Sequence, residues 1–295
     1  MVCDRRVAIT LRTPDVGGLG SALDALRSWQ YDGAPIQLHP GDLGWFWRFG
    51  AETTAAAVRT WSRDDRLLAL GLLDGPNLLR LAIAPDAQDD TELGRSLVAD
   101  LTLPERGVLP AGEAYVEERS ALLKELLAED GWAEAEPWSP LSRDLADPVE
   151  DPGVQIEVTG PERVGERSAV QRASFENSTF TEERWHAMAG GPAYADARCL
   201  VAHDAAGNAV ATVTVWSAGP GKPGLLEPMG VHRDHRGHGY GKAISVAAAA
   251  QLRELGSSSA IVCTPSDNVG AIATYEAAGF RQLPQIRDHG RDMPQ

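Results

Sequence analysis

The sequence has few cysteines, no long apolar run and a shortage of positive charge. Three cysteines occur among the 295 residues, Cys3, Cys199 and Cys263, and none belongs to a C-x-x-C pair. This count and spacing argue against a disulfide framework or a structural zinc site and favour reduced, cytosolic thiols. No apolar run approaches the roughly 20 residues of a membrane span, and the N-terminus has no charged-then-apolar signal segment. We therefore expect a soluble, cytoplasmic protein.

Acidic residues outnumber basic ones, above all in the first half. The chain contains 27 Lys and Arg against 42 Asp and Glu, a formal net charge of −15. Residues 1–150 hold 14 basic and 26 acidic side chains, a net charge of −12, and the remainder holds 13 and 16, a net charge of −3. This balance disfavours nucleic acid or an anionic membrane as the main partner. It favours a cationic or amine-bearing partner, although an acidic surface commonly serves only solubility.

Length and composition predict two compact domains. The chain is about twice the usual domain length of roughly 100–150 residues, and 43% hydrophobic residues suffice for packed cores. The sharpest boundary is the segment 147–153, which contains two prolines and three acids. We place one domain at 1–147 and the other at 153–295.

The sequence of the second domain predicts a clear order of strands and helices. Apolar and β-branched runs predict strands at 154–158, 199–203, 210–215, 225–231 and 260–263. Helices are predicted at 162–175, 240–255 and 268–278. Residues 179–182 match a capping box that opens a further short helix ending at Met188. This order predicts an α/β (α+β) fold, a mixed sheet with an antiparallel hairpin followed by β-α-β-α.

The first half repeats this order more faintly. Strands are predicted at 7–11, 67–73, 78–83 and 114–116, and helices at 19–29, 91–101 and 120–127. The last helix of each half is followed by a glycine and an aromatic residue, Gly131–Trp132 and Gly279–Phe280. This shared pattern after the last helix indicates duplication of one fold, although any α/β domain can end a helix in this way.

One segment, MGVHRDHRGHGYGK, carries most of the functional signal. Gly237, Gly239 and Gly241 lie between a predicted strand and a predicted helix, where each glycine costs roughly 0.5–1 kcal/mol relative to alanine. Backbone without side chains lets a ligand approach the free N–H groups and the positive end of the helix dipole. Arg236 and Lys242 add positive charge, so we interpret the segment as a phosphate-binding loop. Neither G-x-x-x-x-G-K-[ST] nor G-x-G-x-x-G fits it.

Two motifs resemble those of the GNAT (GCN5-related N-acetyltransferase) family. Residues 236–241, RGHGYG, match its Q/R-x-x-G-x-G/A signature, and the spacing of Asn268, Ala271, Tyr275 and Gly279 resembles its closing helix. The resemblance covers about residues 154–290. It implies splayed mixed sheets in two GNAT-like domains, acetyl-CoA as donor, and direct acetyl transfer to an amine of a small molecule or peptide. The tandem arrangement is distantly similar to mycothiol synthase, with slight similarity outside the cofactor motifs.

The resemblance also implies a set of cofactor contacts. Family members separate two parallel strands at the position of Pro228, whose missing N–H is unusual in a central strand; an edge strand is the alternative. The backbone of residues 229–231 would pair with the pantetheine arm and stabilise charge on the thioester oxygen. The implied contacts are Met229, Gly230 and Val231 in the strand, Arg236, Gly237, His238, Gly239, Tyr240, Gly241 and Lys242 in the loop, and Asn268, Ala271 and Ala273 in the closing helix.

Two residues are candidates for proton transfer. By the resemblance, Tyr275 occupies the usual position of the acid that protonates the departing thiolate; a packed aromatic residue is the alternative. Glu227 is the only acid in its strand and shares a face with Met229 and Val231. We take it as the candidate base, directly or through water, with a surface charge as the alternative.

Three histidines in the same region do not predict a metal site. His232, His235 and His238 span a strand end and a loop, and no cysteine or fourth ligand accompanies them. We expect no metal, and for His238 a contribution from its backbone N–H alone.

The first domain lacks the glycine loop. Its equivalent segment, 84–92, has four acids ahead of a helix, which would repel a pyrophosphate. We infer one acetyl-CoA site per chain and a degenerate first domain. For the aromatic segment 43–47, we prefer interdomain packing to an acceptor-pocket wall. A non-catalytic acyl-CoA-binding sensor is the alternative function, and the presence of both Glu227 and Tyr275 favours the enzyme.

Overall fold

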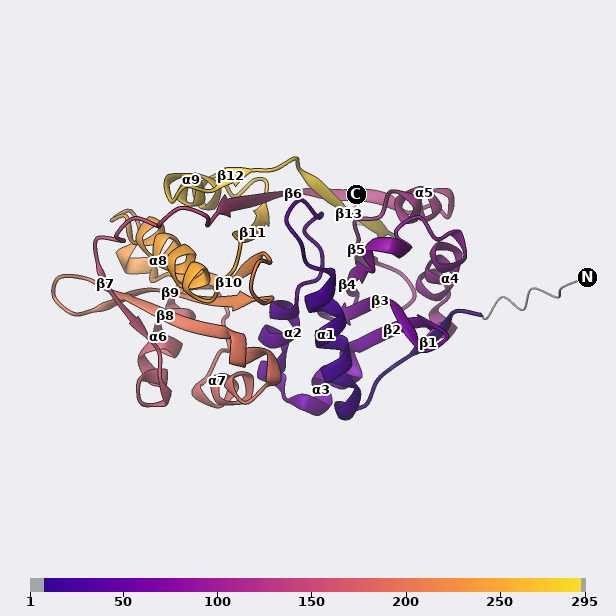
Figure 1. Ribbon diagram of the computed structural model, residues 1–295, viewed down its shortest axis with the longest axis horizontal. Coiled ribbons are helices and arrows are strands. Elements are labelled where there is room, and N and C mark those ends of the chain that lie inside the picture. The colour runs from indigo at the N-terminus through magenta and orange to yellow at the C-terminus, as the bar shows by residue number, and fades with distance from the viewer. Residues whose placement is uncertain (1–7, 293–295) are drawn as a thin grey trace, which may run out of the picture.

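The strands form one continuous mixed sheet that runs through both halves of the molecule (Figure 1). The structure is a computed structural model, which describes residues 8–292. The strand order is β1-β2-β3-β4-β5-β13-β6-β11-β10-β9-β8-β7, with β12 beside β6. Within the described residues, no helix is long and apolar enough to cross a membrane.

The first unit occupies one end of this sheet. Its strands are β1 (Thr10–Arg12), β2 (Val58–Arg63), β3 (Arg66–Leu73), β4 (Leu78–Ile83) and β5 (Ala114–Glu117). Its helices are α1 (Leu19–Trp29), α2 (Pro40–Phe46), α3 (Ala51–Ala57), α4 (Thr91–Thr102) and α5 (Ala121–Glu129). The sequence predicts these elements except β2, α2 and α3, and the strand predicted at 7–11 begins outside the described residues.

The second unit occupies the other end. Its strands are β7 (Gln155–Val158), β8 (Ala197–His203), β9 (Ala209–Ser217), β10 (Gly224–Val231) and β11 (Ser259–Pro265). Its helices are α6 (Val164–Ser174), α7 (Glu182–Ala189), α8 (Tyr240–Glu254) and α9 (Val269–Ala277). The predicted capping box was wrong in its first residue: the hydroxyl that caps α7 belongs to Thr181, which accepts from the Arg184 N–H, because the helix starts two residues later.

The two units repeat one topology. In the first, β1 to β4 pair antiparallel in sequence order and β4 pairs parallel with β5. In the second, β7 to β10 pair antiparallel in sequence order and β10 pairs parallel with β11. α4 and α8 connect the parallel strands of their units, and α5 and α9 follow them. The mixed α/β fold used twice is therefore confirmed.

The last strand of each unit crosses into the other unit's part of the sheet. β6 (Ala133–Asp144) follows α5 but pairs antiparallel with β11 from Trp138 to Asp144. β13 (Ile286–Arg291) ends the described chain and pairs antiparallel with β5. β6 and β13 also pair with each other. This reciprocal exchange carries β13 into the first unit, and the predicted boundary at 147–153 lies between β6 and β7.

The aromatic segment at 43–47 packs between the units, as predicted. Trp45 stacks on Phe180 of the second unit with ring centroids 5.3 Å apart. Trp216 of β9 lies against α2 so closely that a Cβ on Gly44 would approach its ring to 2.3 Å. Its indole N–H donates to the Glu227 carbonyl at 2.7 Å. The first unit therefore supports the strand that carries the candidate base.

Candidate active site

The parallel strands β10 and β11 separate soon after they begin. They pair at only two positions, Gly224 with Ala260 and Leu225 with Ile261. On its other side β10 is irregular against β9 between Leu226 and Met229, the stretch that contains Pro228. The missing N–H of proline is tolerated here because the strand bulges. Beyond Leu225, the β11-facing edge of β10 is left unpaired, which is the splay that the resemblance implies.

The loop after β10 ends in an open helix N-terminus. Gly237 and Gly239 adopt left-handed conformations, with φ of 81° and 83°, and a Cβ on either would meet no atom within 4 Å. Gly239 is the N-cap of α8 and supplies no side-chain cap, and the Ala243 N–H donates to its carbonyl at 3.1 Å. The N–H groups of residues 240–242 therefore point out of the helix start, where an anion would find them.

Two other glycines at the site serve close packing. A Cβ on Gly241 would lie 2.8 Å from Thr274 of α9, and one on Gly230 would lie 2.5 Å from Cβ of Ser174 in α6. Real Cβ atoms do not approach other atoms so closely. Glycine at position 241 therefore lets α9 pack against α8, and glycine at position 230 lets α6 pack against β10. Gly241 therefore has a packing role in addition to its predicted place in the loop.

The charged and aromatic residues of the loop are ordered by neighbouring backbone. The Arg236 guanidinium donates to the Ser174 carbonyl at 2.8 Å, whereas Lys242 is exposed. Nδ1 of His238 lies 2.9 Å from the Arg236 carbonyl oxygen, and its ring stacks on Tyr240 at 6.1 Å. His232 caps a short 3-10 turn through the Asp234 N–H. Among residues 8–292, no group of three or more His, Cys, Asp or Glu is arranged to hold a metal ion.

The closing helix meets the same region. Asn268 is the N-cap of α9, and its side chain accepts from the Ala271 N–H at 3.2 Å. Asn268 and Ala271 both line the cavity described below, whereas Ala273 is exposed and lies outside its lining. Val231 and Tyr240 are half-buried at the base of the loop. Of the sequence-predicted residues, Glu227, Met229, Asn268, Ala271 and Tyr275 line that cavity, and the glycine loop begins where β10 ends.

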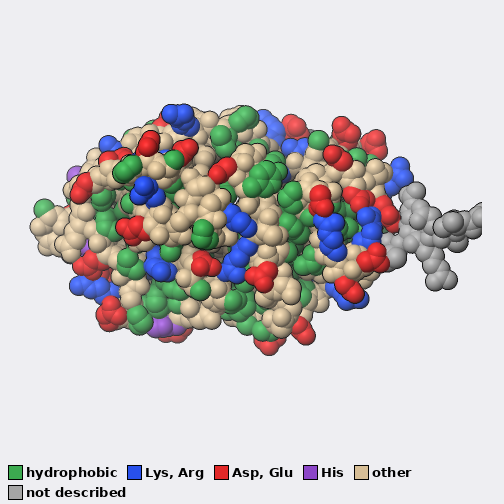
Figure 2. Space-filling model, in the orientation of Figure 1, with side chains coloured by type: hydrophobic (Ala, Val, Ile, Leu, Met, Phe, Trp, Pro, Cys, Tyr) green, Lys and Arg blue, Asp and Glu red, His purple; other side chains and the backbone are tan. Residues whose placement is uncertain are grey.

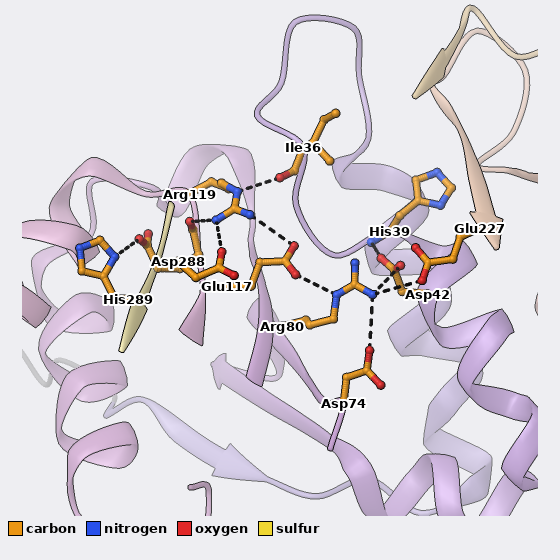
Figure 3. Close-up of polar contacts among 11 residues, drawn as sticks. Ile36, His39, Asp42, Asp74, Arg80, Glu117, Arg119, Glu227, Asp288 and His289 are labelled. Carbon is orange, nitrogen blue, oxygen red and sulfur yellow. Dashed lines mark hydrogen bonds and ion pairs between the residues drawn. The ribbon is translucent and has the colours of Figure 1, made fainter. Parts of the chain in front are cut away.

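A cavity of about 440 Å³ lies between the two units at the splay. The second unit contributes β10 from Leu225 to Met229, β11 from Val262 to Pro265, and Tyr275. The first unit contributes charged side chains from α2, β4 and β5, and the exchanged strand β13 contributes Ile286 and Asp288. Figure 3 shows the polar contacts on this side of the cavity.

Glu227 points toward a cation of the other unit. Its side chain is half-buried in the cavity wall, and its carboxylate lies 4.0 Å from the Arg80 guanidinium (Figure 3). Burial raises the pKa of Glu227, and the positive charge of Arg80 opposes that shift. A carboxyl group with a raised pKa is a better proton acceptor than an ordinary surface glutamate.

Tyr275 also lines the cavity, from α9. It is buried, and its ring packs against Phe280 at 5.7 Å. Burial raises the pKa of Tyr275, with further contributions from Glu227 and Cys263, so the hydroxyl keeps its proton at neutral pH. The packed aromatic role is present, and the residue also lines the cavity.

Sequence reasoning missed the ionic network of the first unit. Arg80 binds Glu117 at 2.9 Å and Asp42 at 3.0 Å, and Arg119 binds Asp288 at 3.1 Å (Figure 3). An arginine in the apolar run LLRLAI was a usable signal for Arg80. The sequence held no such signal for Asp42 and Asp288, because α2 and β13 reach the cavity only through tertiary packing.

The equivalent gap in the first unit is closed by its own side chains. β4 and β5 pair as far as Arg80 and Glu117. Beyond them, the Ile83 N–H donates to the Gln37 side chain at 3.3 Å, and the Ile83 carbonyl accepts from the Gln88 side chain at 2.9 Å. The backbone that a pantetheine arm would need is therefore already hydrogen-bonded.

Several solved structures that are similar to this chain are described as GNAT proteins. A GNAT acetyltransferase from Sphaerobacter thermophilus is 20% identical, with 99% of this chain and 96% of that chain covered and a TM-score of 0.57. A tandem GNAT protein from the clavulanic acid biosynthesis pathway is 16% identical, with 97% and 99% covered and a TM-score of 0.61. A GNAT-family acetyltransferase from Colwellia psychrerythraea is 15% identical, with 96% and 98% covered and a TM-score of 0.59. A comparison with curated proteins finds no match.

These likenesses define the class, an α/β protein with the tandem GNAT fold along nearly its whole described length. The family model of the acetyltransferase (GNAT) family matches residues 167–280. That segment contains β8 to β11, the glycine loop and the closing helix. The match to this family model is therefore confined to residues 167–280, and the remainder of the chain is similar to GNAT proteins in fold.

Proposed function

We propose that the protein is an N-acetyltransferase that transfers the acetyl group of acetyl-CoA directly to an amine bound between the two units. The observation that carries this proposal is that three features of the structure lie together. The splay of β10 and β11, the open N-terminus of α8 and the cavity that contains Glu227 and Tyr275 adjoin one another. The match of residues 167–280 to the acetyltransferase (GNAT) family model supports acetyl transfer in general.

The residues at the splay fit an acyl-CoA donor. The unpaired edge of β10 at Met229, Gly230 and Val231 offers backbone groups to the pantetheine arm. The first-turn N–H groups of α8 and the loop from Arg236 to Lys242 offer donors to a pyrophosphate. We assign the contacts at Asn268, Ala271 and Ala273 to the same donor. When bound, acetyl-CoA supplies the thioester that the acceptor nitrogen attacks.

Proton transfer is assigned to two residues that line the cavity. A protonated amine loses two protons as its N–C bond forms and the thioester C–S bond breaks. Glu227 accepts the first, directly or through a water molecule, and passes it to solvent. Tyr275 donates its proton to the departing sulfur and regains one from the nitrogen. Each group begins the reaction in the required form if Glu227 is ionised and Tyr275 neutral.

The decisive experiment measures CoA release from acetyl-CoA with a broad panel of amines, beside direct calorimetry of acetyl-CoA binding. Acceptor-dependent release supports the proposal. Tight binding of acetyl-CoA with no release from any amine would instead support a non-catalytic acyl-CoA sensor.

The loop assignment predicts a specific loss of donor binding. Gly239→Val places a β-branched residue at a φ of 83° and puts bulk where the donor must approach. We expect acetyl-CoA affinity to fall by at least about a hundredfold, equivalent to ~2.7 kcal/mol. Gly207→Val is a matched control, because Gly207 has a φ of 83° and equally open surroundings in the β8–β9 turn. Unchanged affinity in the Gly239 variant would defeat the assignment.

A further inference from the structure

We propose that the acceptor is a small amine with a second cationic group, such as a diamine, whose distal charge is bound by carboxylates of β5 and β13. This inference rests on the proposed function, since it names the acceptor of the same site. It also gives the first unit and the exchanged strand a role in the reaction, because they build the part of the cavity that selects the acceptor.

Carboxylates outnumber cations around the cavity. Its lining includes two arginines and five acids: Arg80, Arg119, Asp42, Asp74, Glu117, Glu227 and Asp288. Burial lowers the pKa of His39 to about 4, so this side chain is uncharged at pH 7, and burial raises the pKa of Asp42 against the opposing charge of Arg80. Even with Asp42 left out, four carboxylates face two guanidinium groups. A cationic ligand would correct this imbalance, and an anionic one would worsen it.

Both arginines are already occupied. Arg119 is almost fully buried, and its guanidinium donates to the carbonyls of Ile36 and Glu118 as well as to Asp288. Arg80 lies within 4.0 Å of four carboxylates. A nearby third arginine, Arg48, lies outside the lining with its guanidinium 4.2 Å from the ring centroid of Trp45. These arginines are therefore poorly placed to bind an anionic acceptor.

A buried acceptor atom in the same wall lacks a hydrogen bond. Asp42 is 2% exposed, and its Oδ2 accepts from the His39 N–H at 2.6 Å. Within the described residues its Oδ1 accepts no hydrogen bond, although it forms an ion pair with Arg80 at 3.0 Å. Buried oxygen atoms normally have a hydrogen-bond donor. The Arg80 guanidinium is the group that faces this oxygen, so Asp42 belongs to the wall of the cavity and the ligand is left to Glu227, Glu117 and Asp288.

The charges form a row that matches an extended dication. Figure 3 shows Glu227 at one end, Asp288 toward the other, and Arg80, Glu117 and Arg119 between them. Apolar walls beside this row, from Ile36, Leu78, Trp138 and Ile286, suit a chain of methylene groups. The reacting nitrogen would lie at Glu227 and the distal cation near Glu117 and Asp288.

Binding to the CoA complex tests the inference without turnover. The probes are three series of matched chains of three to six carbons: n-alkylamines, α,ω-diamines and ω-amino carboxylates. By calorimetry we expect the best diamine to bind at least about tenfold tighter than the monoamine of equal length. The amino carboxylates should bind more weakly than the monoamines. Equal affinities for diamines and monoamines at every length, or tighter binding of amino carboxylates, would overturn the inference.

Variants locate the distal charge. Asp288→Asn should bring the diamine preference close to one, and Asp74→Asn provides a second test, with a smaller expected loss, if the first variant folds poorly. Asp86→Asn is the matched control, because Asp86 is a first-unit acid paired with Arg66 outside the cavity. A diamine preference without CoA release from acetyl-CoA would reject the transferase and keep the cation site. CoA release with no diamine preference would keep the transferase and reject the cation site.

Discussion

The Glu227 carboxylate lies in one unit and is balanced by an arginine of the other. Burial raises the pKa of Glu227, and Arg80 lowers it. Because a base must be ionised to act, kcat/KM should rise with pH through this pKa. Arg80→Gln removes the opposing charge, so we expect the acid limb of the pH profile to move to higher pH. Arg80→Lys should restore much of its position.

Two controls separate this effect from general disruption. Arg66→Gln removes an exposed first-unit arginine that pairs with Asp86, and its profile should match the parent. Glu227→Gln should abolish the acid limb of the pH profile of kcat/KM. An unmoved limb in a folded Arg80→Gln protein would show that Arg80 does not tune the base.

Tyr275 permits a cleaner test, because only one atom needs to change. Tyr275→Phe keeps the ring that packs against Phe280 and removes the hydroxyl. If that hydroxyl protonates the departing thiolate, kcat should fall by about a hundredfold while acetyl-CoA affinity stays unchanged. Steady-state kinetics and calorimetry measure the two quantities. Parental kcat in the variant would leave Tyr275 with packing alone.

At the scale of elements, the exchanged strand β13 is held by a buried contact between a histidine and a carboxyl group. His289 of β13 lies 3.2 Å from Glu118, and the two residues are 5% and 0% exposed. His289→Leu leaves the Glu118 carboxyl group buried without its partner, so we expect a loss of about 1–3 kcal/mol in the free energy of unfolding. Urea unfolding measures it. The double variant with Glu118→Leu should recover most of the loss, and no loss in the single variant would show that the pair does not stabilise β13.

The exchanged strands are also where prediction from sequence failed. Hairpins, α1, α8 and the cap at Asn268 follow from local patterns, and the structure confirms them. β6 contains Pro137 and Pro140 among glutamates, and β13 contains charged residues and Gly290, so neither shows a period that marks a strand. Their partners lie in the other unit. Local sequence therefore predicts the part of the cavity built by β10, the glycine loop and α9, and omits the part built by the first unit and β13.

At the scale of the whole molecule, the structure shows where the acidic side chains of the first unit lie. Figure 2 shows Asp and Glu side chains gathered on the surface over the end that carries α4 and α5. Asp42, Asp74 and Glu117 of the same unit instead face the cavity. Duplication has thus given one unit an open splay and the other a carboxylate-rich wall opposite it.

This division of labour predicts one donor per chain. Gln37 and Gln88 occupy the backbone of the first unit's gap, and acids at its helix start would repel a pyrophosphate. Acetyl-CoA titration by calorimetry should therefore saturate at about one equivalent per chain, as a single phosphate-binding helix terminus requires. Gly239→Val should remove that binding, whereas two equivalents in the parent, or one left in the variant, would place a second donor site in the first unit. Gln88→Ala opens the closed gap and should still leave one equivalent, because the acids at the start of α4 stay in place.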